Sequence, residues 1–431
     1  MVSYEPLRGM QDYYADEAQK IRKVETIFRE VVEKAGYSEA ITPVVEEFEL
    51  FSVKGGEELR KTMYVFKDKG DREVALRPEI TPSIVRLYLN SLQHFPKPLR
   101  IFYVGRVYRY DEPQLGRYRE FRQAGVEVLG TESILAELEM FHLLNDFYRK
   151  IGLKDNVEFK INNIGIYRKI FDYIKIDDNL QEHVLHLLDK GKINEFYSTL
   201  ERIPIQNSKI MDLLEILTKN GKSVKIEELI AYIDKIDIPE LKIEIEKISL
   251  ISDVLSSLGI NYLIDLSFVR GLAYYTGPIF EVTKKGLPFS IAGGGRYDSL
   301  VEIYGGSKTP AIGFAIGIER TVHALENILL RKEPVHLIAV ITLDNLAIKK
   351  ALEIASILRE NGYVTTLNNK DLSLSKLISL YADQGYTHVI IIGKKELENE
   401  KVTVRNLKTR EQRLVNISEL IRVLNSDMQA N

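Results

Sequence analysis

Apolar residues recur at intervals of three and four positions in the segment 15–35, which predicts one long amphipathic helix. Gly36 follows directly, in the position where helices commonly end. The next segment, 40–45, is rich in β-branched residues and contains Pro43. Because proline has no amide hydrogen to give to a sheet, we expect an edge or interface strand there.

Short apolar runs bounded by turn residues predict the strands of a core sheet. Few helical segments separate these runs, so most neighbouring strands should pair in the antiparallel direction. The predicted strands are 73–77, 99–107, 125–129, 158–161, 262–265 and 279–282.

The patterning changes twice along the chain. Residues 167–256 are rich in Leu, Ile, Lys and Glu at helical spacing, which indicates a helical insertion. After Pro334, strands and helices alternate, as in a small separate α/β domain. We therefore predict an α+β protein whose core, 1–166 and 257–330, is interrupted by the insertion 167–256 and followed by a domain at 334–431.

The composition is that of a folded globular protein, with 45% hydrophobic and 28% charged residues. The chain has no cysteine, which removes disulfides, thiolate zinc sites, iron–sulfur clusters and cysteine nucleophiles. The N-terminus lacks the apolar segment of a secretory signal, and no stretch is long and apolar enough to span a membrane. We expect a cytoplasmic protein with no membrane partner. A net charge of -3 means that any contact with a polyanion must be local.

A metal site receives little support from the sequence. His183 and His186 could share one face of a helix as ligands. No third ligand lies near them in the sequence, so two ordinary helix residues are the favoured interpretation. We predict no dedicated structural metal site.

Candidate chemistry is concentrated in the segment 105–127, where five arginines fall within seventeen residues among aromatic residues. This pattern predicts a strand–loop–strand hairpin that presents guanidinium groups to an anion. Phosphate is the natural candidate, because the planar guanidinium offers two parallel donors. The alternative is a solvated hairpin held by salt bridges. Three further segments combine glycine, arginine and aromatic or acidic residues: 270–277 (RGLAYYTG), 292–298 (AGGGRYD) and 313–320 (GFAIGIER).

Taken together, these segments resemble a known enzyme family. The hairpin resembles motif 2 of class II aminoacyl-tRNA synthetases, the segment 313–320 resembles motif 3, and the long helix leading to Pro43 resembles the motif 1 dimerisation element. The segments 270–277 and 292–298 are similar to two signature stretches of histidyl-tRNA synthetases. The resemblance implies a class II antiparallel-sheet catalytic core with a helical insertion, and an anticodon-binding domain at 334–431.

The activity implied by the resemblance is that of a histidine–tRNA ligase. Members of this family activate histidine with ATP to give histidyl-adenylate and pyrophosphate, and then transfer histidine to the 3′ end of tRNA(His). The implied partners are histidine, ATP with Mg2+, tRNA(His) and a second copy of the chain in a homodimer.

The resemblance also implies roles for single residues around ATP. Arg109 would hold the α-phosphate, and Arg270 would stand near the histidine carboxylate and the α-phosphate, where other class II enzymes use a metal ion. These two are the catalytic candidates. Arg117 would reach the outer phosphates, while Arg320 would serve the adenine face and the γ-phosphate. Phe121 would stack on the opposite side of the base.

The histidine substrate would be held by polar side chains. By resemblance, the α-ammonium group is held by Glu79, Thr81 and Gln123. The imidazole nitrogens would bind Glu127 and Tyr275, and two more tyrosines, Tyr274 and Tyr297, would line the pocket. Taken singly, each could instead be an ordinary surface acid or core aromatic residue.

Contacts with tRNA are expected at two places. The loop of the hairpin, especially Gln114 and Arg117, should approach the acceptor end. Basic residues between 394 and 413 could form a phosphate-binding face, although an ordinary solvated surface explains them equally well. The chain departs from a common family pattern at Ala273, where many members carry aspartate, but that acid is not among the catalytic groups named above.

Two other functions fit the same resemblance. The first is a non-catalytic paralogue that acts as the regulatory subunit of ATP phosphoribosyltransferase in histidine biosynthesis. Such proteins typically lack the C-terminal domain and have an eroded motif 2, whereas both are intact here. The second is a sensor that binds uncharged tRNA, against which the presence of Arg109, Arg270 and Arg320 argues.

Overall fold

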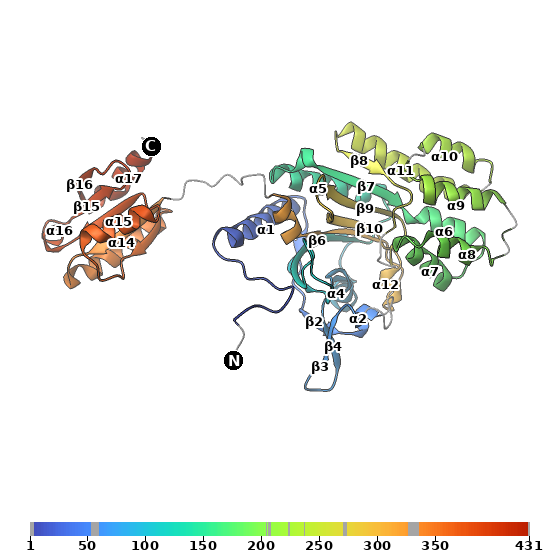
Figure 1. Cartoon of the computed structure of the whole chain (residues 1–431), viewed down its shortest axis with the longest axis horizontal. Coiled ribbons are helices and arrows are strands. Elements are labelled where there is room, and N and C mark those ends of the chain that lie inside the picture. The colour runs from blue at the N-terminus through green and yellow to red at the C-terminus, as the bar shows by residue number, and fades with distance from the viewer. Residues whose placement is uncertain are drawn as a thin grey trace. The chain divides into compact units, whose positions relative to one another are not determined.

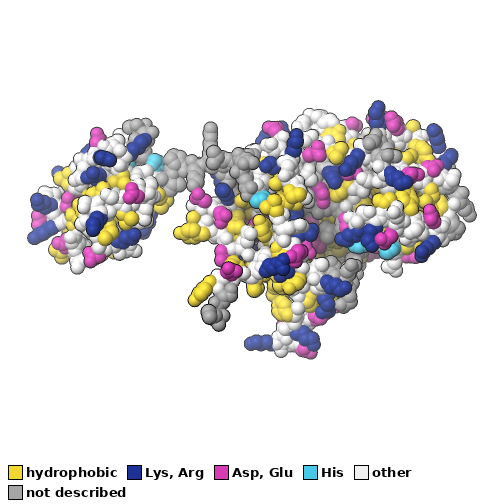
Figure 2. All heavy atoms as spheres, viewed as in Figure 1, with side chains coloured by type: hydrophobic (Ala, Val, Ile, Leu, Met, Phe, Trp, Pro, Cys, Tyr) yellow, Lys and Arg dark blue, Asp and Glu magenta, His cyan; other side chains and the backbone are white. Residues whose placement is uncertain are grey.

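The computed structural model describes residues 4–429 except for 53–59, 204, 206–207, 223–224, 237, 270–273 and 326–335. The chain forms two compact units, Met1–Leu330 and Arg331–Asn431 (Figure 1). Among the described residues, none of the helices has the length and apolar character needed to cross a membrane. On the face of each unit seen in Figure 2, basic and acidic side chains are intermixed.

An eight-stranded sheet forms the centre of the first unit, with the order β1-β5-β6-β11-β10-β9-β7-β8. Only the two outermost pairs, β1–β5 and β7–β8, are parallel, and the pairs between them are antiparallel. The prediction of a largely antiparallel core is therefore confirmed. The strands are β1 (Ser38–Glu39), β5 (Leu99–Tyr108), β6 (Glu120–Leu129), β7 (Val157–Asn163), β8 (Tyr262–Ile264), β9 (Pro278–Lys284), β10 (Ser290–Arg296) and β11 (Ala311–Gly317).

Three helices cover one face of this sheet. They are α1 (Asp16–Lys34), which agrees with the predicted helix to within one residue at each end, α5 (Ile134–Lys150) and α13 (Ile318–Ala324). Phe28 of α1 is 1% exposed and meets the rings of Phe102, Phe147 and Phe314 edge to face. The apolar stripe read from the sequence is thus the surface that joins α1 to the sheet.

The prediction of one strand over 40–45 is wrong. Strand β1 ends at Glu39, and β2 (Val45–Glu47) begins five residues after the predicted start. Carbonyl groups between β1 and β2 bond to a side chain and not to a neighbouring strand. Nη1 of the buried Arg77 donates to the carbonyl oxygens of Thr42 at 2.9 Å and Pro43 at 3.1 Å. A guanidinium group therefore takes the place of a neighbouring strand.

A smaller sheet with the order β2-β4-β3 lies beside this segment. It contains the predicted strand at 73–77, which does not join the main sheet. The elements of this region are α2 (Glu49–Ser52), β3 (Tyr64–Lys67), β4 (Glu73–Leu76), α4 (Thr81–Leu87) and the π-helix Tyr88–Leu92.

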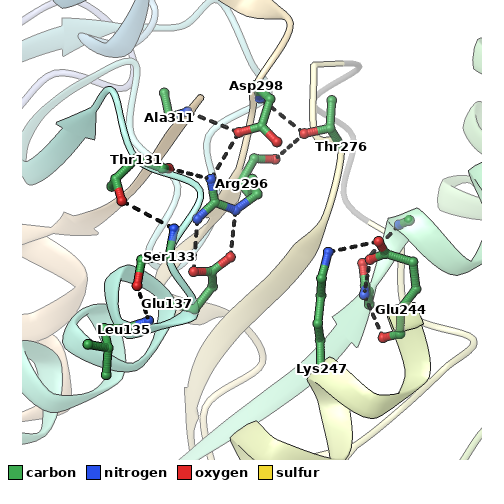
Figure 3. A network of polar contacts seen from close by, with 12 residues as sticks. Thr131, Ser133, Leu135, Glu137, Glu244, Lys247, Thr276, Arg296, Asp298 and Ala311 are labelled. Carbon is green, nitrogen blue, oxygen red and sulfur yellow. Dashed lines mark hydrogen bonds and ion pairs between the residues drawn. The ribbon is translucent and has the colours of Figure 1, made fainter. Parts of the chain in front are cut away.

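The predicted helical insertion is present and gathers beside the β7–β8 edge of the main sheet (Figure 1). Apolar side chains join it to the core of the first unit, and polar contacts add to this attachment: Nδ2 of Asn163, at the end of β7, donates to Oε2 of Glu244 at 2.7 Å and to its carbonyl oxygen at 2.8 Å. Lys247 donates to the other oxygen of the same carboxylate (Figure 3). The helices are α6 (Ile164–Tyr173), α7 (Asp178–Asp189), α8 (Ile193–Leu200), α9 (Ser208–Asn220), α10 (Ile226–Ile233) and α11 (Pro239–Ser257).

The second unit contains the predicted alternation of strands and helices. Its five-stranded sheet has the order β13-β12-β14-β15-β16, parallel among the first three strands and antiparallel among the last three. The elements are β12 (Leu337–Thr342), α14 (Ile348–Glu360), β13 (Val364–Leu367), α15 (Leu374–Asp383), β14 (His388–Ile392), α16 (Lys394–Glu398), β15 (Lys401–Asn406), β16 (Gln412–Asn416) and α17 (Leu420–Gln429).

Candidate active site

One pocket on the main sheet collects nearly all the candidate residues that the structure describes. Gln114 is the described candidate that does not line it, although its backbone pairs with that of Arg117 inside the same loop, at 2.8 and 3.1 Å. Arg270 and Ala273 lie outside the described residues. The candidates that line the pocket are Glu79, Thr81, Arg109, Arg117, Phe121, Gln123, Glu127, Tyr274, Tyr275, Tyr297 and Arg320.

The hairpin β5–β6 explains why residues spaced along one strand meet in this pocket. Side chains alternate between the two faces of a strand, so Phe121, Gln123 and Glu127 of β6 share one face. Strand β11 runs antiparallel beside β6 and places Gly313 opposite Glu127. A Cβ atom on Gly313 would lie 1.8 Å from Oε2 of Glu127, so only glycine leaves room for this carboxylate.

Glu127 lies at the bottom of the pocket inside a cage of hydroxyl groups. Its side chain is 1% exposed. Thr81 Oγ1 donates to its Oε1 at 2.6 Å, Tyr103 OH donates to the same oxygen at 3.2 Å, and Tyr297 OH donates to Oε2. Burial raises the pKa of Glu127 from 4.5 to about 7, although the three hydroxyl donors pull it down. The result is a buried acceptor that changes its charge near neutral pH.

A second carboxylate lies at the wall of the same pocket. Tyr274 OH donates to Oε2 of Glu79 at 3.0 Å, and burial together with the charge of Glu79 raises the pKa of Tyr274. Nearby, Oε1 of Gln123 accepts from the backbone amide of Ile80 at 3.0 Å, which fixes the orientation of its side-chain amide. The pocket therefore offers two acidic groups at separate points, each oriented by a neighbour.

The other side of the pocket carries arginines that are held by backbone carbonyl groups. Arg109 Nε donates to the carbonyl of Pro78 at 2.9 Å, and its guanidinium lies 5.4 Å from the centre of the Phe121 ring. Arg320 donates to the carbonyls of Gly116 at 2.6 Å and Ser290 at 2.9 Å. A neutral carbonyl orients a guanidinium without cancelling its charge, so these two groups suit an anionic ligand.

Only two of the five hairpin arginines face this pocket, Arg109 and Arg117. Arg106 and Arg122 form ion pairs with carboxylates at 2.7 and 2.8 Å. Arg119 lies over the ring of a tyrosine, 4.0 Å from its centre. The alternative of a salt-bridged hairpin therefore holds for Arg106 and Arg122, whereas Arg109 and Arg117 face the pocket, with Arg117 also 3.8 Å from Asp111.

Arg296, the arginine of the segment 292–298, also binds carboxylates of the protein itself. Arg296 is 5% exposed, donates through Nε and Nη2 to Glu137 of α5, and donates through Nη1 to Asp298 at 3.0 Å (Figure 3). Asp298 in turn accepts from the amide of Ala311 and donates its own amide to Thr276. This network joins α5, β10 and the start of β11 behind the pocket.

Sequence reasoning gave no role to Tyr103, or to Glu319, the acid of the acid–arginine pair that ends the segment 313–320. Tyr103 lies opposite Gly125 in the β5–β6 register, which lets its hydroxyl reach Glu127. Its place in a predicted strand of the hairpin was the available signal. Glu319 is buried, accepts from the backbone and side chain of Arg122, and lines the pocket.

No group of three or more His, Asp or Glu side chains suited to a metal ion occurs within the described part of the chain. Two other acids that line the pocket, Asp111 and Glu319, already lie within 3.8 and 2.8 Å of arginine nitrogens. The protein thus offers few carboxylate oxygens to a cation in this pocket.

Comparisons with known proteins agree with this geometry. A family model described as histidyl-tRNA synthetase matches residues 9–321, and a model described as an anticodon binding domain matches residues 337–427. The histidine–tRNA ligase of Metallosphaera sedula is 63% identical over 425 residues, covering 98% of this chain and 99% of that protein. The one from Sulfurisphaera tokodaii is 54% identical over 96% of each chain.

Solved structures share the fold. The apo histidyl-tRNA synthetase of S. aureus superposes with a TM-score of 0.69 at 27% identity, covering 98% of this chain and 99% of that one.

Proposed function

Since the chain belongs to the histidyl-tRNA synthetase family, we propose that the pocket on its main sheet carries out both steps of histidine–tRNA ligation. In the first step histidine reacts with ATP to form histidyl-adenylate and pyrophosphate. In the second step the histidyl group moves to the 3′ end of tRNA(His). The observation that carries the assignment of the site is that a hydroxyl-caged carboxylate and two carbonyl-held arginines line the same pocket.

Histidine would bind at the carboxylate side. Glu127 accepts an N–H of the imidazole, with Tyr275 at the other ring nitrogen and Tyr297 along the wall. Glu79 pairs with the α-ammonium group, helped by Thr81 and Gln123. Analogues without ring nitrogens would lose the hydrogen bonds to Glu127 and Tyr275, and a site that relies on such bonds can discriminate by roughly four to five orders of magnitude.

ATP would bind at the arginine side. An oxygen of the substrate carboxylate attacks the α-phosphorus in line, a new O–P bond forms, and the bond from the α-phosphorus to the bridging oxygen breaks, so that pyrophosphate leaves. Arg109 and Arg270 stabilise the charge on the equatorial oxygens, Phe121 and Arg320 enclose the adenine, and Arg117 binds the outer phosphates. Arginine remains protonated throughout, so these donors stay charged during the reaction.

Magnesium would enter with ATP, and supplies positive charge to the β- and γ-phosphates when bound. Because Asp111 and Glu319 already lie beside arginines, we expect phosphate oxygens and water to supply most of its ligands. Among the residues of this chain, Arg109 and Arg270 would act on the α-phosphate and Arg117 on the outer phosphates.

The transfer step needs the acceptor end of tRNA beside the adenylate. The ribose hydroxyl oxygen attacks the histidyl carbonyl carbon, and the bond from that carbon to the phosphate oxygen breaks. AMP leaves with the bonding electron pair, and a phosphate oxygen of AMP takes the hydroxyl proton. Gln114 lies in the loop next to Arg117, where it would contact the acceptor end. The C-terminal unit would bind the anticodon, as the family model for residues 337–427 describes.

A homodimer in the cytoplasm is the proposed working form. Exposed apolar side chains support the dimer: Ile41, between β1 and β2, is 87% exposed, and Val45, the first residue of β2, is 44% exposed. Covering such a patch is a common reason for association. Sedimentation of the Ile41→Asp variant tests this, since it should shift the protein toward monomer, and an unchanged dimer would place the interface elsewhere.

The deciding experiment for the function is histidine-dependent exchange of labelled pyrophosphate into ATP, followed by charging of a tRNA(His) transcript. The wild type should do both, and Arg109→Ala should lose about 100- to 1,000-fold in exchange. A chain that binds histidine without exchange would instead be the regulatory paralogue, which its intact C-terminal domain and its relatives disfavour.

A further inference from the structure

The N-terminal segment Arg8–Gly9 lies against the loop that carries the pocket arginines. The carbonyl oxygen of Gly9 accepts from the backbone amide of Arg119 at 2.7 Å. Arg8 forms an ion pair with Glu112 of the same loop. Two successive residues thus hold the two sides of the loop 109–119, one through the backbone and one through charge.

Gly9 combines a backbone conformation that disfavours a side chain with a close approach to the loop. Its φ is +85°, in the left-handed region that favours glycine. A Cβ atom would lie 2.7 Å from Cγ of Arg119 and 2.9 Å from Cγ of Pro113. An alanine would therefore separate the segment from the loop.

The contact continues directly to a pocket arginine. Arg119, whose amide bonds to Gly9, accepts through its own carbonyl from the amide of Arg109 at 2.9 Å. The side chain of Arg119 also donates to the carbonyl of Asp111 at 3.1 Å and lies over the ring of Tyr110. A displacement at Gly9 would thus reach the base of the loop through two backbone hydrogen bonds.

We propose that Arg8 and Gly9, here called the N-terminal strap, are positioning residues that fix the arginine loop and so set the affinity for ATP. The inference rests on the proposed function, because it assumes that Arg109 and Arg117 bind ATP. It extends that function to residues that touch neither substrate.

The strap has little part in the core. Arg8 is exposed, and the neighbouring Leu7 is 70% exposed, so its release should leave the unit folded. Within the described residues, no hydrogen bond joins Arg8 or Gly9 to Glu127 or the hydroxyl groups around it. A loss of the strap should therefore act on ATP and spare histidine.

The test compares Gly9→Ala with Gly305→Ala in pyrophosphate exchange. Gly305 has φ +84° with open space around an added Cβ, so it carries the same backbone strain without the steric conflict and outside the pocket. Gly9→Ala should raise the KM for ATP about tenfold and change the KM for histidine less than twofold. Gly305→Ala should change neither. Equal effects of the two variants, or a fall in kcat alone, would overturn the proposal.

A charge exchange provides an independent measurement. Arg8→Glu should raise the KM for ATP about two- to fivefold, the range expected for an exposed ion pair. Adding Glu112→Arg to this variant should bring the KM for ATP back toward the wild-type value. A double variant with a KM for ATP as high as that of Arg8→Glu would contradict the role of the ion pair. If the wild type shows no exchange at all, the proposed function fails. If the wild type exchanges normally and Gly9→Ala leaves the KM for ATP unchanged, only the proposed role of the strap is rejected.

Discussion

Replacing Glu127 by glutamine tests the chemistry of the histidine site most directly. Glutamine has nearly the same shape but no charge, and one of its two polar ends is a donor. In the structure both carboxylate oxygens accept from hydroxyl groups, of Thr81 and Tyr103 on one side and Tyr297 on the other. At least one of these O–H groups would then face an N–H group.

The magnitude follows from the burial of this group. A hydrogen bond to a charged acceptor contributes about 1.5 to 3 kcal/mol, and an imidazole N–H held by Glu127 would lose it. We expect Glu127→Gln to lower kcat/KM for histidine roughly 10- to 150-fold in pyrophosphate exchange. The KM for ATP should stay within about twofold of wild type, because Arg109 and Arg320 are held by other groups.

The pH dependence gives the same test a second readout. The pKa of Glu127 is raised to about 7 by burial, so the carboxylate becomes a proton-free acceptor only as the pH rises through neutrality. Wild-type kcat/KM for histidine should therefore rise between pH 6 and 8, beyond the change due to the imidazole of free histidine, whose pKa is about 6.5. Glu127→Gln should keep only the substrate's own titration.

Tyr103→Phe is the matched control. It removes one hydroxyl, at 3.2 Å, and keeps the carboxylate. Because this hydrogen bond lowers the pKa of Glu127, its loss should move the rise in kcat/KM to higher pH. A Glu127→Gln enzyme with unchanged kcat/KM for histidine, or with an equal loss for ATP, would refute the assignment of the imidazole slot.

Three further predictions follow from the same contacts. Because the pKa of Glu127 is raised, the native state binds more protons than the unfolded state between pH 4.5 and about 7. As the pH rises through this window, wild type should lose up to about 3 kcal/mol of stability relative to Glu127→Gln. Guanidinium unfolding of both proteins at pH 5 and pH 8 measures this loss, and an equal change in both proteins would contradict it. Gly313→Ala should abolish histidine-dependent exchange in a folded protein, since its Cβ would lie 1.8 Å from the Glu127 carboxylate; a normal rate would show that the site can relax. Arg168→Met should raise the KM for histidine severalfold and Arg168→Lys should partly restore it, because Arg168 of α6 donates to the carbonyl of Tyr275 at 3.3 Å; an effect on kcat alone would point to stability instead.

The helices and most strands could be predicted because their signals are local. The stripe of apolar side chains in α1 is visible in a short window of sequence. The apolar pattern predicts β6 only over 125–129, whereas the strand begins at Glu120. Its pairing with β5 over this whole length places Phe121, Gln123 and Glu127 on one face. The resemblance supplied the rest of the candidate set.

The orientation of charged side chains could not be predicted in the same way. Arg106, Arg109 and Arg122 have the same chemistry in the sequence, but one binds a carbonyl and the others bind carboxylates. The partner of Arg122 is Glu319, 197 residues away, so the choice depends on the pairing of β6 with β11. The same applies to 40–45, where the distant Arg77 takes the carbonyl groups that a strand would have used.

The way Arg109 is held has a consequence for the end of the catalytic cycle. A carbonyl dipole is a weaker competitor than an oxyanion, so the resting site should attract sulfate, inorganic phosphate and above all the phosphate of AMP, which leaves in the second step. We expect retention of this product to slow turnover. The reverse reaction stays possible until the leaving group dissociates, and the rate of dissociation should depend on ionic strength.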